Sequence, residues 1–575
     1  LIASKPTLPG IQEVKMKVRL SCNYRSAIAW ACLAFSAGSL AAESPAPVQI
    51  NVVAINDLHG YLEPNPQDYA GAQGATRLTY GGIATLGAML DELRTQDPDL
   101  LFIGAGDLIG GSPAISALWA DEPVLEALNA MGMIVSASGN HELDAGKAEF
   151  LRQIHGGCES TRPEKACKFR GNYPGSGFPY IASNLIDTTT GKRLLPAYHI
   201  QQVKGVKIAF VGAVPRNMEK VVSARAFAGL KATDEAQAIN DVIPELKAKG
   251  VNAIIAVMPQ GGDTAEPFDT KDCSQLGGAI VDVAKRLDPA VDAVISGHSH
   301  ASYQCKVGDL SITQAGKYGH FLTQLKLQVT PGTHHVTNIT ARNIPADPQN
   351  YLPNAKLTSL LEEVRQRSGE KLLEPIGRIS TAELDREENA AGETTLGNLV
   401  TDAQLAMTQA FQTQVAFLNL GGLRSDLIQP ADSDLTYEQL FAVQPFNNPL
   451  IVQELTGRQI TELLNLQWNR GSFNPLQVSK GFHYEWDGSR PVGSRVVEGS
   501  VRLHGKPLEP LTHYRVVSNL FLADGGGGLA TFKEGRRRQD TGITDLEALV
   551  EYVRQNHERG IAIGQRSEPR ISMTP

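Results

Sequence analysis

Four short blocks of the sequence place carboxylate, imidazole and amide side chains beside glycine. They are residues 56–60 (NDLHG), 106–107 (GD), 139–144 (GNHELD) and 297–300 (GHSH). Such oxygen and nitrogen donors are ligands for divalent cations, and two ions held close together suit the hydrolysis of phosphate esters. One such pair alone is usually a turn or a surface pair. Four blocks in order along one chain predict a shared metal centre.

Each block follows a short apolar run of the kind found in buried strands, at residues 50–55, 100–103, 134–137 and 291–295. In open α/β sheets, sites form where the carboxyl ends of strands meet loops. Further apolar runs predict strands over 207–211 and 253–257, and helical spacing predicts helices over 82–94, 121–131 and 236–248. This alternation predicts an α/β domain that carries the metal centre.

The chain of 575 residues is too long for a single core, so two or more domains are expected. Prolines 345, 348 and 353, followed by an amphipathic pattern over 356–368, predict a linker with a hinge helix at 343–372. The linker would separate a catalytic domain at 48–342 from a second α/β domain at 373–575. The net charge of −8 argues against a nucleic-acid polymer as partner, but not against a small anion beside bound cations.

The N-terminal region has the pattern of a targeting segment. Met16 precedes basic residues, an apolar run covers 27–37, and small residues follow at 39–42. Residues 1–42 are therefore expected to be upstream residues and a signal peptide, which predicts a periplasmic or secreted protein. A membrane anchor is the alternative, and no later segment is long and apolar enough to span a bilayer.

Four of the six cysteines lie beyond this segment, and an even number in an exported chain predicts two disulfides. Three connectivities are open. We favour Cys158 with Cys167, which closes a short polar loop, and Cys273 with Cys305, which ties a loop to the segment after His300. No CxxC spacing supports metal binding by thiolates.

The motifs INDLHG, GAGDLIGGSP, GNHELD and SGHSH resemble the calcineurin-like metallophosphoesterases, and in particular the secreted bacterial 5'-nucleotidase and UDP-sugar hydrolase family. The likeness spans nearly all of the chain after residue 48. It implies an N-terminal four-layer α/β/β/α metallophosphoesterase domain, a linker helix and a C-terminal α/β substrate-binding domain.

The resemblance also implies the ligands of two divalent ions, for which Zn, Mn, Mg and Co remain open. Asp107 is the natural bridge, because it is the only ligand candidate in its block. One ion would take Asp57, His59, Asp107 and His300. The other would take Asp107, Asn140, His298 and one more histidine.

That last histidine is missing from this sequence. The segment 254–262 (IIAVMPQGG) occupies its place, and Pro259 stands where the imidazole is expected. Proline cannot ligate a metal through its side chain, although Gln260 or a water could fill the gap. We therefore expect the second ion to bind more weakly than the first.

His141 follows Asn140 directly, but the resemblance gives it a catalytic role. It would face the phosphate and form a dyad with Asp144, which would orient the ring. A charged imidazole there stabilises the transferring phosphoryl group or protonates the leaving oxygen. The alternative for Asp144 is a cap at a helix N-terminus.

Three blocks of the C-terminal third, 419–424 (NLGGLR), 445–448 (PFNN) and 520–528 (LFLADGGGG), resemble the family motifs NGGGIR, PF-x-N and F-x-x-x-GGDG. The resemblance implies that the rings of Phe446 and Phe521 sandwich a nucleobase. It also implies a phosphate contact by Arg424 and a contact of Asn419 with the base or its loop. Arg386 is a second candidate phosphate contact. The substrate-binding set is therefore Arg386, Asn419, Arg424, Phe446 and Phe521.

One further departure concerns the sugar. Gly527 stands where the family has an aspartate that binds ribose hydroxyls, so substrate preference is expected to differ. A 5'-nucleotidase acting on small-molecule nucleotides is the first choice. Hydrolysis of UDP-sugars, 2',3'-cyclic-nucleotide phosphodiesterase with 3'-nucleotidase action, and a weakly catalytic nucleotide-binding protein remain open.

Overall fold

The computed structural model describes residues 47–71, 74–251, 253–330, 335–469, 471, 473–564 and 569–574. The predicted signal peptide at 1–42 lies outside these ranges. Within them, no helix has both the length and the apolar character that a bilayer span requires.

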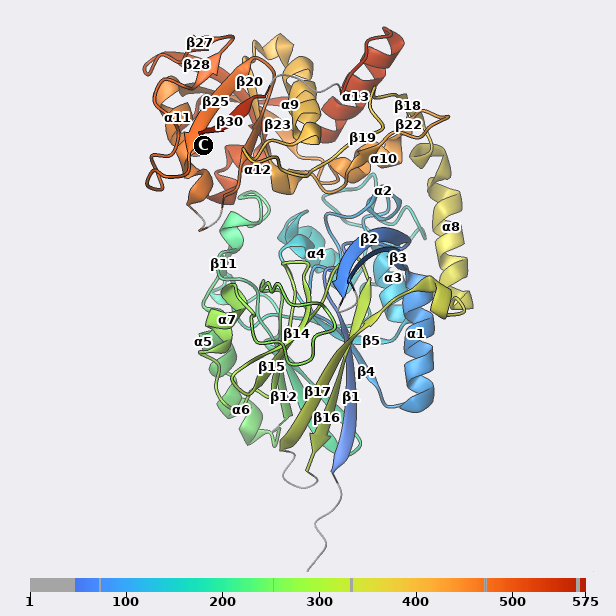
Figure 1. The fold of residues 1–575 in the computed structure, drawn as a ribbon. Helices are drawn as coiled ribbons and strands as arrows, with labels where there is room; N and C mark the ends of the chain where they lie inside the picture. The colour runs from blue at the N-terminus through green and yellow to red at the C-terminus, as the bar shows by residue number, and fades with distance from the viewer. Residues whose placement is uncertain are drawn as a thin grey trace, which may run out of the picture. The chain divides into compact units, whose positions relative to one another are not determined.

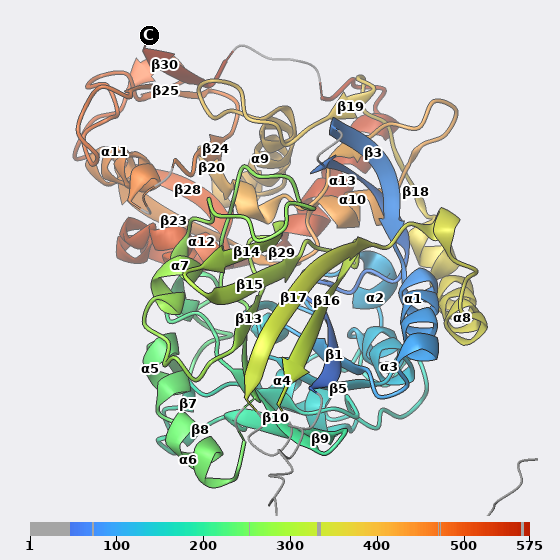
Figure 2. The same cartoon turned by 60° about the horizontal axis from the view of Figure 1, so that its bottom comes forward.

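The catalytic half is built on two six-stranded sheets (Figures 1 and 2). The first has the order β17 (Val336–Pro345), β16 (Phe321–Val329), β1 (Val48–Ile55), β4 (Leu101–Gly104), β5 (Met133–Ala137) and β6 (Tyr180–Ile181). The second has the order β14 (Ser302–Val307), β15 (Leu310–Ala315), β13 (Ala293–Ser296), β12 (Ala253–Met258), β10 (Val206–Gly212) and β9 (Tyr198–Val203). All six strands predicted from the sequence of this half are confirmed, and neighbouring strands among them run parallel.

The alternation of side chains along β1 shows why the sheets lie face to face. Ile50, Val52 and Ala54 belong to a buried cluster that also contains residues of β10, β12 and β13. Val53 and Ile55 point the other way, into a cluster with the helices α1 (Ile83–Gln96) and α3 (Glu122–Ala130). Successive residues of a strand face opposite sides, so each strand serves two cores.

The outer face of the second sheet is covered by α5 (Glu235–Asn240), α6 (Ile243–Ala248) and α7 (Ala279–Ala284). The helix, sheet, sheet, helix order confirms the four-layer architecture. The single helix predicted over 236–248 is wrong, because the structure has two helices there. Pro244, in the first turn of α6, has no N–H, and its ring would clash with the carbonyl of residue 240 in a continuous helix.

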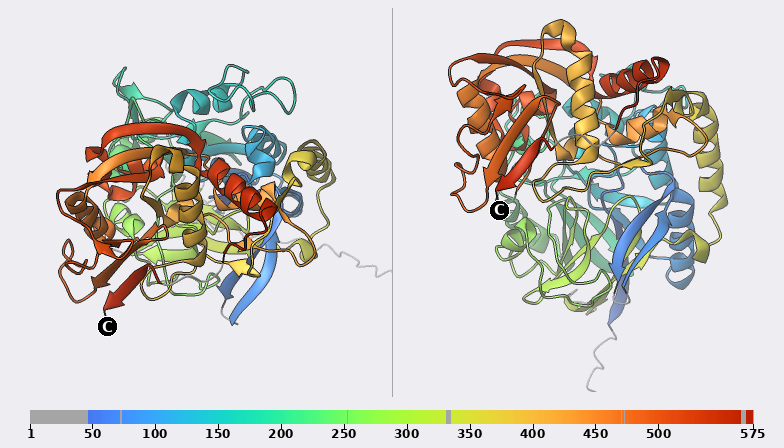
Figure 3. Two further views of the ribbon diagram at one scale, coloured as in Figure 1. Left: turned by 90° about the horizontal axis from the view of Figure 1, so that it is seen from above. Right: turned by 45° about the horizontal axis from the view of Figure 1, so that its top comes forward.

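The predicted hinge helix is α8 (Ala355–Leu372), and its N-terminus is capped by the Asn354 side chain, which accepts a hydrogen bond from Leu357 N. Beyond it lies a five-stranded sheet in the order β24 (Leu476–Val478), β20 (Val415–Asn419), β28 (His513–Asn519), β23 (Pro449–Thr456) and β29 (Arg536–Thr544). The helices α9 (Thr395–Met407) and α13 (Asp545–Glu558) pack on one face and α11 (Gly457–Asn465) on the other (Figure 3). A C-terminal α/β fold is confirmed.

Shorter helices include α2 (Ala114–Ala117), α4 (Lys147–His155), α10 (Tyr437–Val443) and α12 (Leu520–Ala523). Residues 46–575 form one compact unit, so the domain boundaries near 342 and 373 stay predictions. The structure pairs Cys158 with Cys167 and Cys273 with Cys305, which is the pairing favoured from the sequence.

Candidate metal centre and substrate cavity

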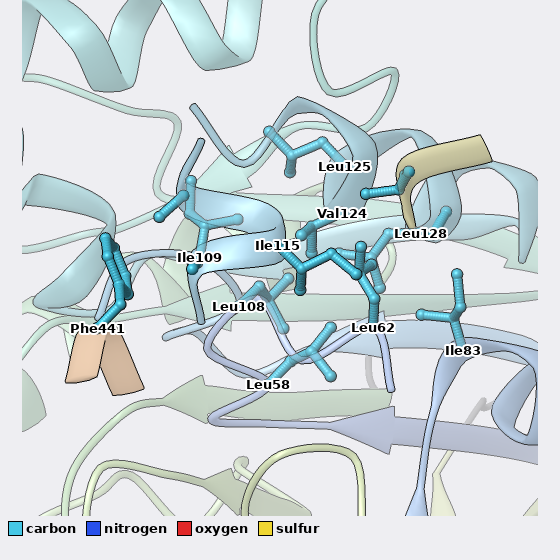
Figure 4. Close-up of a cluster of buried hydrophobic side chains, with 14 of the residues drawn as sticks. Leu58, Leu62, Ile83, Leu108, Ile109, Ile115, Val124, Leu125, Leu128 and Phe441 are labelled. Atoms are coloured by element: carbon cyan, nitrogen blue, oxygen red, sulfur yellow. The ribbon is translucent and has the colours of Figure 1, made fainter. Parts of the chain in front are cut away.

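The loops that carry the candidate ligands are anchored in the hydrophobic core by their own leucines. Leu58 lies between Asp57 and His59, Leu108 follows Asp107, and both leucine side chains are fully buried. Figure 4 shows them in the cluster that also holds Ile83, Val124 and Leu128. The buried leucines thereby fix the loop backbone directly beside Asp57, His59 and Asp107.

Backbone strain marks the same loops. Five of the six candidate ligands have φ between +46° and +75°: Asp57, His59, Asp107, His298 and His300. Residues other than glycine seldom adopt this region, and a cluster of them is characteristic of a functional site held by its surroundings. Asn140, with φ −78°, is the exception.

Glycines let the loops approach each other closely. A Cβ on Gly139 would lie 2.2 Å from Asp107 Oδ1, and a Cβ on Gly297 would lie 3.0 Å from Asp57 Oδ2. The glycines of the GNHELD and GHSH blocks are therefore required for space beside the carboxylates.

Glu142 ties two of the loops together. Its buried carboxylate accepts hydrogen bonds from the backbone N–H groups of Asp107 (3.0 Å), Leu108 (2.8 Å) and Gly139 (2.7 Å). Burial, with the nearby negative charge of Asp107, raises the pKa of Glu142 to about 8. The sequence interpretation missed this residue, although it stands inside the GNHELD motif.

The first candidate ion position is formed by Asp57, His59 and His300, whose donor atoms all lie within 4.8 Å of one another. The Nε2 atoms of the two histidines are 3.0 Å apart, and His300 Nε2 is 3.6 Å from Asp57 Oδ1. His59 Nδ1 lies 2.8 Å from the carbonyl oxygen of Gly110. A proton on Nδ1 donated to that carbonyl leaves Nε2 free to ligate.

The second candidate position joins Asp107, Asn140 and His298. His298 Nδ1 is 2.9 Å from Asn140 Oδ1 and 4.0 Å from Asp107 Oδ2. All six predicted ligands therefore lie in two groups, which are linked where the His298 N–H donates to the Asp57 carboxylate at 2.9 Å.

The electrostatics of these groups fit bound cations. Asp57 and Asp107 are buried, and burial, followed by the charge of Asp107, raises the pKa of Asp57 well above its usual value. Asp107 Oδ2 has no hydrogen-bond partner among the described residues. Burial lowers the pKa of both His59 and His300, which keeps their rings neutral. Two buried carboxylates beside neutral imidazoles lack a counter-charge that a divalent cation supplies.

Pro259 packs near the loop that carries Asp107, and its role as the replaced ligand stays a prediction. A Cβ on Gly106 would come within 3.1 Å of Pro259 Cγ, and a Cβ on Gly261 within 3.6 Å of His298 Cδ2. Gln260 does not take the missing place, because its Nε2 donates to Glu235 and its Oε1 accepts from Gly261 N. The second ion would then have one fewer protein ligand.

We predict that dialysed protein retains fewer than two divalent ions per chain, and that Pro259→His raises this number. The added imidazole would complete the second ligand set. Metal content measured by plasma emission spectrometry checks this, with Pro259→Ala as the control for loss of the proline ring. Two tightly held ions in the unmodified protein would contradict the prediction.

His141 and Asp144 form the predicted pair. His141 Nδ1 lies 3.0 Å from Asp144 Oδ2, and the His141 backbone N–H donates to Asp107 Oδ1 at 2.8 Å. Burial lowers the pKa of His141, but the Asp144 carboxylate outweighs it and the pKa is raised overall. Asp144 follows the short helix His141–Leu143, and the N-cap of α4 is Gly146, so an N-cap role for Asp144 is not observed.

A cavity of about 470 Å³ opens on the metal groups. It is lined by Asn140, His141, Asp144, His298 and His300 from the catalytic half, and by Asn419, Arg424, Phe446 and Phe521 from the C-terminal half. The Phe446 ring lies nearly parallel to that of His141, with centroids 5.7 Å apart, and the Arg424 guanidinium lies over its face at 5.6 Å. The structure therefore brings four of the five predicted substrate residues to the predicted ligands.

Arg386 is the fifth, and it does not line this cavity. Its Nε donates to Asp426 Oδ1 at 3.0 Å, and it faces a second cavity that also contains Arg424. Residues that the sequence interpretation missed also line the first cavity: Lys220, Gln467, Phe473 and Asn519. Asn519 directly precedes the LFLADGGGG block, and this neighbouring motif is a sequence signal for a cavity residue. Gln467 and Phe473 stand in a segment without a motif.

Two family models match the chain: calcineurin-like phosphoesterase over residues 50–302, and 5'-nucleotidase C-terminal domain over residues 375–534. Endonuclease YhcR of Bacillus subtilis is 29% identical over 534 residues, which cover 92% of this chain but only 41% of that protein. A 5'-nucleotidase of Diplobatis ommata is 26% identical over 558 residues, covering 89% of this chain and 88% of that protein.

A 5'-nucleotidase precursor from Thermus thermophilus has a solved structure of the same fold, with a TM-score of 0.72 at 24% identity. The match covers 92% of this chain and 99% of that one. The family models account for both halves of the molecule, and the resemblance seen in the four motifs is confirmed. The chain belongs to the 5'-nucleotidase family of calcineurin-like phosphoesterases.

Proposed function

We propose that the protein is a metal-dependent phosphohydrolase that removes the 5'-phosphate from nucleotides. One observation carries this proposal: a single cavity contains ligand candidates of both metal groups, the His141–Asp144 pair and the rings of Phe446 and Phe521. A substrate that is anionic at one end and aromatic at the other fits such a cavity, and nucleotides have this form.

Different residues of the cavity would bind the base and the phosphate of the substrate. Phe446 and Phe521 offer ring faces for stacking, which contributes about 1–3 kcal/mol per base and tolerates different bases. The Arg424 guanidinium lies over the Phe446 ring and close enough to His59 and His300 to help lower their pKa, so it can pair with phosphate oxygens there. Asn419 is held by a hydrogen bond from Asn519 and lines the same wall.

At the phosphate end of the substrate, the His141 ring would hold a proton beside the phosphate. Asp144 fixes the His141 ring through Nδ1, which leaves Nε2 to donate to the leaving oxygen. The residues that would hold two divalent ions are Asp57, His59, Asp107, Asn140, His298 and His300. When bound, the ions would supply positive charge for the phosphate and lower the pKa of a water.

Gly527 leaves the sugar end of the cavity open. A Cβ there would meet only Leu529 and Phe521, at 4.0 Å, so the cavity has room where the family has a carboxylate. This supports keeping UDP-sugars and 2',3'-cyclic nucleotides as further candidate substrates. The two disulfides support a periplasmic or secreted location, since disulfides persist in oxidising compartments.

A phosphate-release assay tests the proposal with AMP, UDP-glucose and 2',3'-cyclic AMP, each with Mn²⁺, Mg²⁺, Co²⁺ and Zn²⁺. We expect release from AMP with at least one ion and its loss on adding EDTA. Nucleotide binding without phosphate release under all four ions would instead identify a weakly catalytic nucleotide-binding protein.

A further inference from the structure

The turn that presents Phe446 to the substrate cavity consists of residues 445–448 (PFNN) and lies between α10 and β23. Phe446 and Asn448 both line the cavity, whereas Asn447 between them is exposed. Asn447 has φ +53°, in the left-handed region that residues other than glycine seldom adopt. Such a turn keeps one conformation only when its surroundings hold it.

The N-terminal end of the turn is held by a residue of the cavity itself. The Arg424 N–H donates to the carbonyl oxygen of Val443 at 2.9 Å, and the Arg424 guanidinium lies over the Phe446 ring at 5.6 Å. Both contacts come from the NLGGLR block, which the sequence already marks as part of the site. This end of the turn therefore needs no residue from outside the cavity.

The C-terminal end of the turn is held from outside the cavity, by Asp545 in the first turn of α13. The Asp545 N–H donates to the carbonyl oxygen of Asn448 at 2.9 Å, and the Asn448 side-chain amide donates to Asp545 Oδ2 at 3.3 Å. One residue thus binds both the main chain and the side chain of Asn448, although the two are 97 positions apart. Asp545 belongs to none of the motif blocks.

The Asp545 side chain is shielded from solvent, since the residue is only 2% exposed. Burial raises its pKa to about 7, although Asn448 and Leu546 donate hydrogen bonds to it. Hydrogen bonds in such surroundings are stronger than in water. Among the described residues, Asn448 is the only one whose side chain donates to this carboxyl, so Asp545 acts on the cavity through Asn448.

We propose that Asp545 is a positioning residue for base binding, which fixes the turn 445–448 through Asn448 and so holds the Phe446 ring against the base. The inference rests on the proposed function, and it assigns part of the affinity for the base to a residue outside the cavity. Asp545 touches neither the substrate nor the metal groups. Its loss should therefore weaken binding of the base and leave binding of the phosphate unchanged.

Two probes without a phosphate ester separate the two ends of the substrate. Adenosine has the base without a phosphate, methylphosphonate has a phosphoryl group without a base, and both are titrated calorimetrically into the Mn²⁺-loaded full chain. Asp545→Ala should weaken adenosine binding about 5- to 20-fold, within the loss expected when one base-stacking ring is removed, and should leave methylphosphonate binding unchanged. The exposed Glu558→Ala, at the far end of α13, is the matched control and should keep both affinities.

A double-mutant cycle with Asn448→Ala tests the route of the effect. If Asp545 acts through Asn448, the double variant should lose no more adenosine affinity than the weaker-binding single variant. Asp545→Asn keeps an oxygen that can accept from the Asn448 amide, so it should restore most of the affinity. Additive losses in the double variant would overturn the positioning role.

Equal loss of affinity for both probes, or no loss for adenosine, would overturn the inference, and so would a lack of adenosine binding by the unmodified protein. Thermal unfolding identifies a folding defect, and Asp545→Ser should show the same selective loss if Asp545→Ala fails to fold. In turnover, Asp545→Ala should raise KM for AMP by a similar factor and leave kcat nearly unchanged. If the unmodified protein releases no phosphate from AMP, the proposed function fails, whereas the adenosine titration still decides the role of Asp545.

Discussion

Replacing His141 by alanine should lower kcat for nucleotide hydrolysis about 10²- to 10⁴-fold, the usual contribution of a positioned general acid. The ring is held by Asp144 at 3.0 Å and lies in the cavity beside the metal groups. Its side chain is directed at Asp144 rather than at Asp107 or His298, so the number of bound ions should stay the same. Steady-state kinetics on AMP, with metal analysis of the same samples, measures both quantities.

The exposed His155→Ala at the end of α4 is the matched control, and should keep the kcat of the unmodified protein. Asp144→Asn should give a smaller loss than His141→Ala, because the ring would remain but lose the carboxylate that charges it. Unchanged turnover in His141→Ala would reject the catalytic role. A parallel fall in bound metal would instead assign His141 to the metal centre.

The Asp107→Asn variant should lose both bound metal and activity. Asp107 lies beside the second candidate ion position, and its buried Oδ2 has no hydrogen-bond partner among the described residues. Removal of its charge takes away the counter-charge for the cations. We expect kcat to fall about 10²- to 10³-fold or more, as when one preorganised charged or polar group is removed from a transition state.

The fold of this variant should survive, because the asparagine carbonyl can still accept the hydrogen bond from the His141 N–H. Circular dichroism melting in EDTA tests the fold, and metal titration followed by kinetics tests the site. Asp99→Asn, at an exposed turn, is the matched control. Full activity with two bound ions in Asp107→Asn would show that the carboxylate does not bridge.

The strands and the ligand positions of the catalytic half could be predicted from the sequence, because both depend on short segments of the chain. Strands such as β1, β4, β5 and β13 are runs of apolar residues that end in glycine-containing loops, so both the strand and the ligand positions appear in the linear pattern. The motif likewise shows that Pro259 stands where the family has a histidine. The split of 236–248 at Pro244 also has a local cause, because a proline inside a helical pattern interrupts the helix.

Residue types and their spacing specify which side chains can ligate metals, and the same motifs specify the family to which the chain belongs. The surroundings of Glu142, Lys317 and Arg386 depend instead on how distant segments of the chain pack together. Glu142 accepts hydrogen bonds from the amides of two loops, and Arg386 pairs with Asp426 in the second cavity. Lys317 lies close enough to Arg424, in the other half, for that charge to help lower its pKa. These contacts join residues up to about a hundred positions apart, and no local propensity encodes them, because they arise from the packing of whole sheets and helices.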